Sequence, residues 1–204
     1  MKFSAILLAA GLSSRMAGRH KLLLPINGQS VVRRCARILL EAGPEELVVV
    51  TGHDGESVTA ALEGLAVHTV FNSHYEQGQM TSVGAGVNSL IEPCDAVMVC
   101  LADQALLHRS DYMDLVTAFA ARSHGSLLVP QFQGKRGNPI MFASGHIPDI
   151  LNNGRQLGCR KLIQDNPDAV FAYQASHDRY TIDMDTPDDY AYMLQRVAEE
   201  HGYA

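Results

Sequence analysis

Short apolar runs alternate with segments of helical period through the first two thirds of the chain, and this alternation constrains the fold most strongly. Residues 3–9 and 96–102 are continuous apolar runs of strand length, typical of strands that are buried on both faces. Segments such as 30–42, which lie between such runs, place apolar residues at helical spacing. Because parallel strands need crossover connections, usually helices, the pattern predicts an α/β fold with a mostly parallel central sheet flanked by helices.

The same periodicities predict the individual elements. Strands are expected at 3–9, 47–51, 67–71, 96–102, 126–130, 139–142 and 170–174. Helices are expected at 30–42, 56–63, 81–91, 111–122 and 187–200. Ser30 and Thr186 are the expected N-caps of the first and last of these helices. Since the sequence shows no repeat or linker, we expect one domain over residues 1–204.

Composition narrows the functional class. The 204 residues are 47% hydrophobic and 19% charged, which excludes a disordered or collagen-like chain, and the net charge of -6 disfavours a general nucleic-acid binder. The four cysteines form no CxxC pair and have no zinc-ligand spacing, so we expect buried thiols in a reducing cytoplasm. No apolar run reaches membrane-spanning length and no signal peptide is evident, which predicts a cytoplasmic protein with no membrane partner.

The loop after the first predicted strand suits an anionic ligand. In open α/β sheets, ligands bind at the carboxyl ends of the strands. Ala9, Ala10 and Gly11 are small enough to let a ligand approach the backbone. Arg15 and Lys21 add positive charges that suit a triphosphate. The loop matches neither the P-loop nor the dinucleotide-binding fingerprint, and an ordinary solvated loop with two surface cations is the alternative.

Two acidic segments suit a hard divalent cation. Asp103 ends an apolar strand, where an aspartate is rarely buried unless it is paired or binds metal; a turn or cap residue is the alternative. Asp183 and Asp185 precede the last predicted helix, whereas Asp188 and Asp189 complement the dipole of that helix and need no further role. Because Mg²⁺ prefers one or two carboxylates plus phosphate oxygens, Asp103 with Asp185 is a candidate metal pair.

Two further motifs have plain structural alternatives. The segment GQMTSVGAG at 78–86 has glycines that permit backbone contact, and its Ser82 is able to bond a ribose or a base; a glycine-rich helix start chosen for packing explains it equally well. The segment GKRGNPIMF at 134–142 is a turn that enters a strand, with a lip against a second substrate as the functional alternative. The histidines at 53, 74 and 177 are expected on the solvated surface.

Six segments, taken together and in this order, resemble the MobA-like nucleotidyltransferases, most closely their molybdenum cofactor cytidylyltransferase branch. They are LAAGLSSRM with Lys21 and LLLP, Asn72 before GQMTSVGAG, LADQ, RGNPIMF, GCRKLI at 158–163, and DMDTPDD. The resemblance spans nearly the whole chain. It implies a Rossmann-like nucleotidyltransferase fold and Mg²⁺-dependent transfer of a nucleotidyl group.

The resemblance also implies roles for individual residues. The positions that match nucleotide-binding residues of the family are Leu8, Ala9, Ala10 and Gly11 of the signature loop, Arg15 and Lys21 at the triphosphate, Ser82 and Asp103. Arg15, Lys21 and Asp103 match catalytic positions, and Asp103 and Asp185 match the two acids that bind the metal.

The implied reaction transfers CMP from CTP to the phosphate of molybdopterin and releases pyrophosphate. The implied partners include a recipient molybdoenzyme or its maturation chaperone. The Ala9-Ala10-Gly11 form is similar to CTP users, whereas GTP-using relatives often carry LAGG. Three alternatives stay open: GTP or another acceptor phosphate on the same fold, a non-catalytic nucleotide- or cofactor-binding module, and a glycosyltransferase that uses the DxD at 183–185.

Three positions depart from the pattern of the family. Ala17 is an extra residue before Lys21, Ala105 follows LADQ where proline is usual, and Asn138 stands where histidine is common. These departures bear on the reach of Lys21, on the turn that carries Asp103 and on contacts to the second substrate.

Overall fold

Strands and helices alternate along the chain in the computed structural model, which describes residues 1–16, 18–152 and 158–202. The strands are β1 (Phe3–Ala9), β2 (Pro25–Ile26), β3 (Gln29–Ser30), β4 (Leu47–Thr51), β5 (His68–Phe71), β6 (Ala96–Leu101), β7 (Leu127–Phe132), β8 (Lys135–Arg136), β9 (Ile140–Ala143) and β10 (Val170–Gln174). The helices are α1 (Val31–Glu41), α2 (Gly55–Ala61), α3 (Gln79–Asn88), α4 (Arg109–Ala121), α5 (Ile147–Asn152), α6 (Cys159–Asp165) and α7 (Pro187–Gly202).

The main sheet has eight strands in the order β10-β7-β9-β6-β1-β4-β5, with β8 paired to β7 outside that path. β1 lies inside the sheet and pairs in parallel with both β4 and β6, so that Leu8 lies opposite Val50 on one side and Leu101 on the other. β9 runs antiparallel to its neighbours β6 and β7. The mostly parallel sheet expected from the sequence is therefore confirmed, and β9 is its one reversed strand on the main path.

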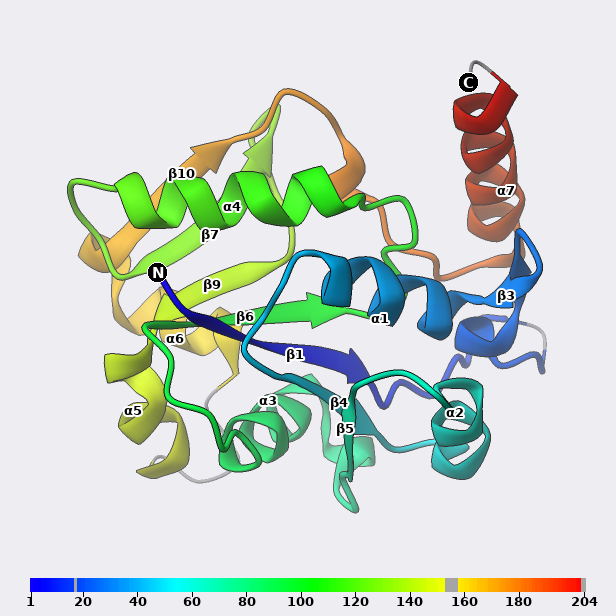
Figure 1. Ribbon diagram of the computed structural model, residues 1–204, viewed down its shortest axis with the longest axis horizontal. Coiled ribbons are helices and arrows are strands. Elements are labelled where there is room, and N and C mark those ends of the chain that lie inside the picture. The colour runs from blue at the N-terminus through cyan, green and yellow to red at the C-terminus, as the bar shows by residue number, and fades with distance from the viewer. Residues whose placement is uncertain (17, 153–157, 203–204) are drawn as a thin grey trace.

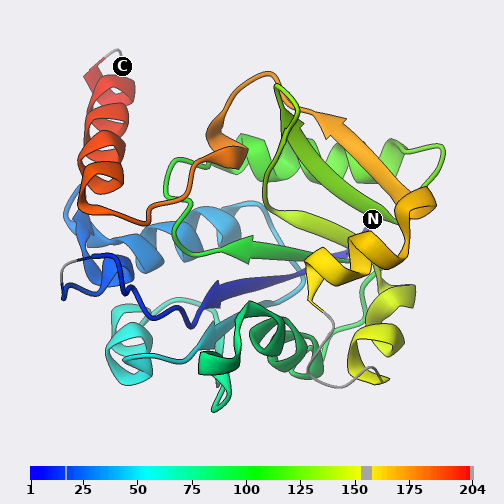
Figure 2. The same ribbon diagram turned by 180° about the vertical axis from the view of Figure 1, so that it is seen from behind.

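Helices cover both faces of this sheet (Figures 1 and 2). α1 and α4 pack on one face, where alternate residues of β1 such as Leu7 point, and α3, α5 and α6 pack on the other face with Ile6. Every residue of β1 is buried. This two-sided burial explains why the first strand is a continuous apolar run instead of an alternating one.

The predicted elements agree closely with the observed ones where periodicity is strong. β1, β4 and β10 have the predicted bounds. The hydroxyl of Ser30 accepts from the backbone N–H of Arg33 at the start of α1, and Thr186 exchanges hydrogen bonds with Asp189 at the start of α7. Helix α3 begins two residues before the predicted start. The short helices α5 and α6 were not predicted, because one or two turns carry too little periodic signal.

The prediction of buried thiols is confirmed for two of the four cysteines, whereas Cys94 and Cys159 are half-buried. All four are free, and Cys35 and Cys100 are buried in the core. Burial raises the pKa of the Cys35 thiol to about 12, which makes it an unreactive apolar side chain. Among the residues that the structure describes, no helix combines the length and apolar character needed to cross a membrane.

A buried ion pair ties the last third of the chain to α4. Asp111 accepts hydrogen bonds from Arg179 (Nη2 to Oδ1, 2.6 Å; Nε to Oδ2, 2.8 Å) and lies 3.2 Å from Nε2 of His177. Burial opposes ionisation of Asp111, but hydrogen bonds from Arg179 and from the backbone of His108 outweigh it and lower the pKa of Asp111. His177 therefore belongs to this cluster, and its side chain is half-buried instead of fully solvated as expected.

Replacing Asp111 tests this tie. We expect Asp111→Asn to lower the free energy of unfolding by about 3 kcal/mol at pH 7, because Arg179 loses its ionic partner. The pKa of Asp111 is lower in the folded than in the unfolded chain, so its contribution is present above about pH 4 and is lost as the pH falls through the folded pKa. Urea unfolding at pH 7 and pH 3 measures both effects. Asp114→Asn, on the exposed side of the same helix, is the control; a gap between the two variants that stays constant with pH contradicts the assignment.

One glycine of the GQMTSVGAG segment is explained by packing. A Cβ at Gly86 would lie 2.5 Å from Cγ2 of Ile6 and 3.1 Å from Cγ2 of Val50, because α3 lies directly on β1 and β4. At Gly84, two residues earlier in the same helix, a Cβ would meet nothing within 4 Å. The packing interpretation of this motif therefore holds at Gly86.

These two glycines form a matched pair for mutation. We expect Gly86→Ala to destabilise the protein by about 1–3 kcal/mol, since the added methyl group overpacks the interface between α3 and the sheet. Gly84→Ala should stabilise it by about 0.5–1 kcal/mol, because alanine is favoured in a helix and the space is open. Thermal unfolding monitored by circular dichroism measures both. Equal melting temperatures for the two variants would show that α3 does not approach the sheet as closely as described.

Candidate active site

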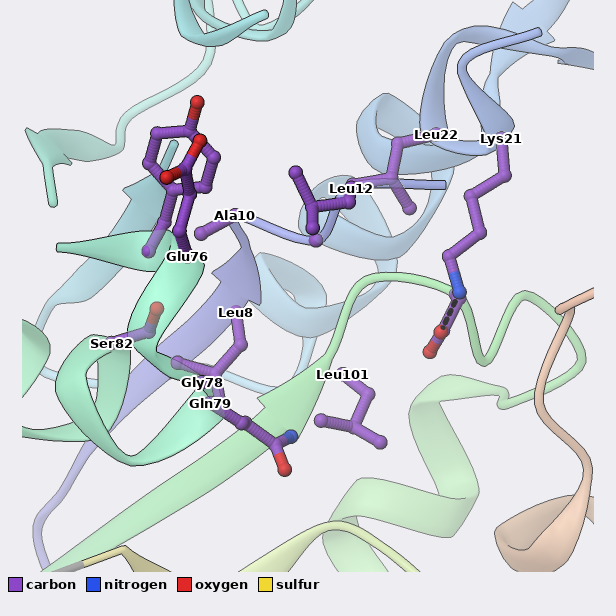
Figure 3. A pocket seen from close by; sticks show the side chains of 13 residues that line it. Leu8, Ala10, Leu12, Lys21, Leu22, Glu76, Gly78, Gln79, Ser82 and Leu101 are labelled. Carbon is purple, nitrogen blue, oxygen red and sulfur yellow. Dashed lines mark hydrogen bonds and ion pairs between the residues drawn. The ribbon is translucent and has the colours of Figure 1, made fainter. Parts of the chain in front are cut away.

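A cavity of about 300 Å³ opens at the carboxyl ends of the parallel strands β1 and β6, beside the start of α3 (Figure 3). Its lining comprises Leu8, Ala10, Gly11, Leu12, Lys21, Leu22, Tyr75, Glu76, Gly78, Gln79, Ser82, Leu101 and Asp103. In Figure 3, Lys21 and Glu76 lie on opposite sides of this group of side chains. The cavity therefore has the place that the open α/β sheet predicts for a ligand.

The loop after β1 forms one wall of the cavity through its small residues. Leu8, Ala10 and Gly11 line it, and a Cβ at Gly11 would meet nothing within 4 Å, so a ligand has room beside the backbone. The side chain of Ala9 is buried in the core on the α1 face and does not line the cavity. In an extended strand, neighbouring side chains point to opposite faces, so the side chain of Leu8 faces the cavity and Ala9 is left with its backbone for the predicted ligand contact.

Ser82 lines the opposite wall and is held by a buried asparagine. Asn72 follows β5 and donates from Nδ2 to Oγ of Ser82 at 3.0 Å and to Oγ1 of Thr81 at 2.8 Å. Since the Ser82 oxygen accepts this bond, its own hydroxyl hydrogen is available to a ligand. Asn72 thus connects the end of β5 to the helix that carries Ser82.

Four charged side chains meet at the Lys21 end of the cavity. Nζ of Lys21 lies 2.5 Å from Oδ2 of Asp103, the contact marked in Figure 3, and 3.0 Å from Oδ1 of Asp185. Nη2 of Arg15 lies 2.7 Å from Oδ2 of Asp185. The structure therefore brings together four predicted residues from three distant parts of the sequence, two cationic and two anionic.

Lys21 is buried, whereas Arg15 remains 66% exposed. Burial alone would lower the pKa of Lys21, but the carboxylates of Asp103 and Asp185 outweigh it and raise the pKa, so the ammonium stays charged. The backbone N–H of Lys21 donates to the hydroxyl of Ser13, which closes the loop around it. The extra residue Ala17 lies outside the described residues, and Lys21 nonetheless reaches both acids.

Each acid is fixed by the element next to it. Asp103 is the second residue after β6, and the N–H of the intervening Ala102 donates to the carbonyl of Leu8. Asp185 precedes α7, and its N–H donates to Oδ2 of Asp189. The first-turn acid Asp189 therefore has a positioning task at the helix start, besides complementing the dipole.

The donor set fits a hard divalent cation. Oδ1 of Asp103 is buried and has no hydrogen-bond partner within the described part of the chain, although a buried carboxylate oxygen normally has one. Both acids present oxygen ligands of the kind that Mg²⁺ and Mn²⁺ bind. Across residues 1–16, 18–152 and 158–202, no group of three or more His, Cys, Asp or Glu side chains has metal-binding geometry. Two carboxylates are thus available, which leaves the remaining positions for phosphate oxygens and water.

Sequence reasoning missed part of the lining. Tyr75, Glu76 and Gln79 follow β5 and line the wall next to Ser82, while Leu12 and Leu22 line the wall next to Lys21. The signal for the first group was present, because the segment after β5 leaves the same carboxyl edge of the sheet. Leu12 and Leu22 carry no chemical signal, and only the folded loop places them here.

A family model described as the MobA-like NTP transferase domain matches residues 5–170. The chain belongs to this family. The matched range contains Lys21, Ser82 and Asp103, and every residue that lines the cavity lies within it. The protein is accordingly a nucleotidyltransferase.

Known relatives align along most of the chain. The molybdenum cofactor cytidylyltransferase of Escherichia coli (strain K12) is 26% identical over 198 residues, which cover 95% of this chain and 96% of that protein. The nicotine blue oxidoreductase of Paenarthrobacter nicotinovorans is 26% identical over 189 residues, which cover 90% of this chain and 92% of that protein. The similarity therefore extends well beyond the signature loop.

Solved structures share the fold. A nucleotidyl transferase from Methanothermobacter aligns with a TM-score of 0.81 at 23% identity, covering 98% of this chain and 99% of that chain. Rv0371c from Mycobacterium tuberculosis H37Rv, in complex with manganese, aligns with a TM-score of 0.75 at 20% identity, covering 96% and 99% of the two chains. These similarities confirm the Rossmann-like nucleotidyltransferase fold that the sequence predicted.

The position of Lys21 between the two acids gives a testable expectation. Lys21 contacts both acids, so Lys21→Met should leave Asp103 without a cationic partner and Asp185 with Arg15 alone. This should raise the affinity for Mn²⁺ about tenfold in the absence of nucleotide. Titration of the free Mn²⁺ signal by electron paramagnetic resonance measures this. Arg19→Met, which removes an exposed cation from the same loop, should leave the affinity unchanged. Unchanged or weaker Mn²⁺ binding by Lys21→Met would show that its ammonium does not occupy the cation position.

Proposed function

We propose that this protein transfers a cytidylyl group from CTP to a phosphate of a molybdopterin-type acceptor and releases pyrophosphate. The observation that carries the proposal is the cluster of Lys21, Arg15, Asp103 and Asp185 at one end of a cavity at the carboxyl edge of the sheet. Such a cluster combines groups for a triphosphate with groups for a divalent cation. The other parts of the cavity then have the place and chemistry for a nucleoside.

The proposed nucleoside site lies between the loop after β1 and the start of α3. The open space at Gly11 admits a flat ring close to the backbone, and the free hydrogen of Ser82 is available to a ribose or base oxygen. Leu8 and Ala10 supply apolar contact. The preference for CTP rests on the Ala9-Ala10-Gly11 form, which is similar to CTP users, and on the cytidylyltransferase among the relatives.

In the proposed reaction, a phosphate oxygen of the acceptor attacks the α-phosphorus of CTP. A new oxygen–phosphorus bond forms, the bond from the α-phosphorus to the bridging oxygen breaks, and pyrophosphate leaves with the electron pair. No protein nucleophile is needed, so the side chains position the reactants and stabilise charge. Lys21 and Arg15 bind the phosphates and stabilise the negative charge that develops on the leaving group.

Asp103 and Asp185 would hold Mg²⁺, which supplies charge neutralisation to the phosphate oxygens when it is bound. Lys21 contacts both acids in the structure, so its ammonium exchanges these carboxylates for phosphate oxygens when the nucleotide arrives. Arg15, on the exposed side of Asp185, is able to follow the phosphates because its side chain is largely solvated. The chain thus keeps its local charge balanced in the free and the loaded states.

Support for the acceptor comes from the relatives and from the sequence resemblance. The E. coli relative aligns over 95% of this chain, including the segments that follow β7. The departures from the family pattern do not disturb the described geometry of the acids. Ala105 is buried, and its carbonyl accepts from Nε of Arg34, which fixes the turn after Asp103 without a proline.

A panel of nucleotides tests the proposal. With Mg²⁺ and metal-loaded molybdopterin, we expect pyrophosphate release from CTP to exceed that from GTP, ATP and UTP at least tenfold. Asp103→Asn should lower the rate about 100-fold or more, because it removes a charged ligand of the proposed metal. Asp188→Asn, an exposed first-turn acid, is the control and should keep the rate.

The outcomes separate the alternatives. Turnover that favours GTP, or that needs another acceptor phosphate, contradicts the CTP or molybdopterin part while keeping the nucleotidyltransferase. Tight CTP binding with no pyrophosphate release in the presence of the acceptor identifies a nucleotide-binding module instead. Transfer of a sugar from a nucleotide sugar would identify a glycosyltransferase.

A further inference from the structure

Asp103 and Asp185, the two proposed metal ligands, are far apart in sequence, so contacts within the fold must hold Asp185 near Asp103. Asp103 follows β6, whereas Asp185 lies in an irregular segment between the short helix Arg179–Thr181 and α7. We propose that Gln104 is a positioning residue for this pair, which fixes the segment of Asp185 against the turn of Asp103. The inference rests on the proposed function, because it concerns the same metal pair.

The geometry of Gln104 carries the proposal. The residue is 1% exposed, and its Nε2 donates both to the carbonyl of Tyr180 at 3.0 Å and to Oδ1 of Asp183 at 2.9 Å. Next to it, the N–H of Met184 donates to the carbonyl of Asp103 at 3.2 Å. Residues 180, 183 and 184, which lead directly to Asp185, are therefore bonded to residues 103 and 104.

A second set of contacts, from β8 and the turn that follows it, holds the short helix Arg179–Thr181 that leads into this segment. The N–H of Asn138 donates to the carbonyl of Tyr180 at 2.9 Å, and Nζ of Lys135 donates to the carbonyl of Thr181 at 2.6 Å. A Cβ at Gly137 would lie only 2.2 Å from the Tyr180 oxygen, so only glycine permits this approach. The RGNP turn thus braces the segment that Gln104 holds.

The Gln104 side chain is poorly explained by stability alone. Its Oε1 is buried and has no hydrogen-bond partner in the described part of the chain, an arrangement that costs free energy. An apolar side chain of similar size would avoid that cost while filling the same space. The two hydrogen bonds that Nε2 donates to Tyr180 and Asp183 are therefore what a glutamine supplies here and an apolar side chain would not.

Gln104 is able to hold the segment of Asp185 after Lys21 has left the two acids for the triphosphate. In the structure, Lys21 bridges Asp103 and Asp185, but in the proposed reaction it turns to the triphosphate. The two acids then lose their shared cationic contact at the moment when their separation matters for metal binding. The bonds from Gln104 do not involve Lys21, so they hold the segment throughout.

The test uses the purified full chain with Mn²⁺ as the probe. We expect Gln104→Met to weaken Mn²⁺ binding at least tenfold and to raise the KM for the metal more than it lowers kcat. Its melting temperature should stay within a few degrees of that of the wild type, and CTP binding in the presence of a chelator should be unchanged. Ser126→Ala removes a side-chain hydrogen bond to His146 away from the site and is the control.

A second pair of variants separates the hydrogen bond from the charge. Asp183→Asn and Asp183→Leu both remove the carboxylate charge, but only the asparagine keeps an oxygen for Nε2 of Gln104. We expect Asp183→Asn to bind Mn²⁺ more tightly than Asp183→Leu by at least fivefold. This pair decides the matter if Gln104→Met fails to fold.

Three results would overturn the inference. The first is a Gln104→Met variant that binds Mn²⁺ as tightly as the wild type. The second is a Ser126→Ala variant that loses as much Mn²⁺ affinity as Gln104→Met does. The third is an equal Mn²⁺ affinity of Asp183→Asn and Asp183→Leu. A wild-type chain that binds no Mn²⁺ and releases no pyrophosphate refutes the proposed function, and the inference falls with it. A wild-type chain that does both, with unaffected variants, refutes the inference alone.

Discussion

The parallel pairing of β1 with both β4 and β6 is the constraint on which the rest of the structure depends. Because the three strands run in one direction, their carboxyl ends meet at one edge, and the loops that follow them face the same space. Burial on both faces fixes β1 in the interior of the sheet. The small residues at its end therefore line the same cavity as Asp103, which lies just beyond the end of the neighbouring strand β6.

That edge would be unstable without a balance of charge. Asp103 and Asp185 are brought close together, and two carboxylates at such a distance repel each other unless cations lie between them. Lys21 and Arg15 provide those cations in the structure. The same four groups suit a triphosphate with a divalent cation, because the phosphates then replace the carboxylates as partners of the basic side chains. Structural stability and the proposed chemistry thus draw on one electrostatic arrangement.

Much of the fold could be predicted because its strands are buried on two faces. Such strands are continuous apolar runs, and helices between them follow from amphipathic spacing, as β1, β4 and α1 show. The reversed direction of β9 could not be predicted, since an apolar run has no signal for direction. The half-buried place of His177 beside Asp111 was also missed, because it depends on which neighbours the fold supplies.

The sequence by itself determined the α/β class, the family and the chemical type of the site residues, because these depend on local periodicity and on motifs along the chain. Only the tertiary structure decided how these residues combine. It placed Lys21 within contact of acids 82 and 164 residues away, and it assigned Gln104 and the RGNP turn to the support of Asp185. The physical reason is that ion pairs and hydrogen bonds depend on distance in space, and only the paired strands bring these distant segments into contact.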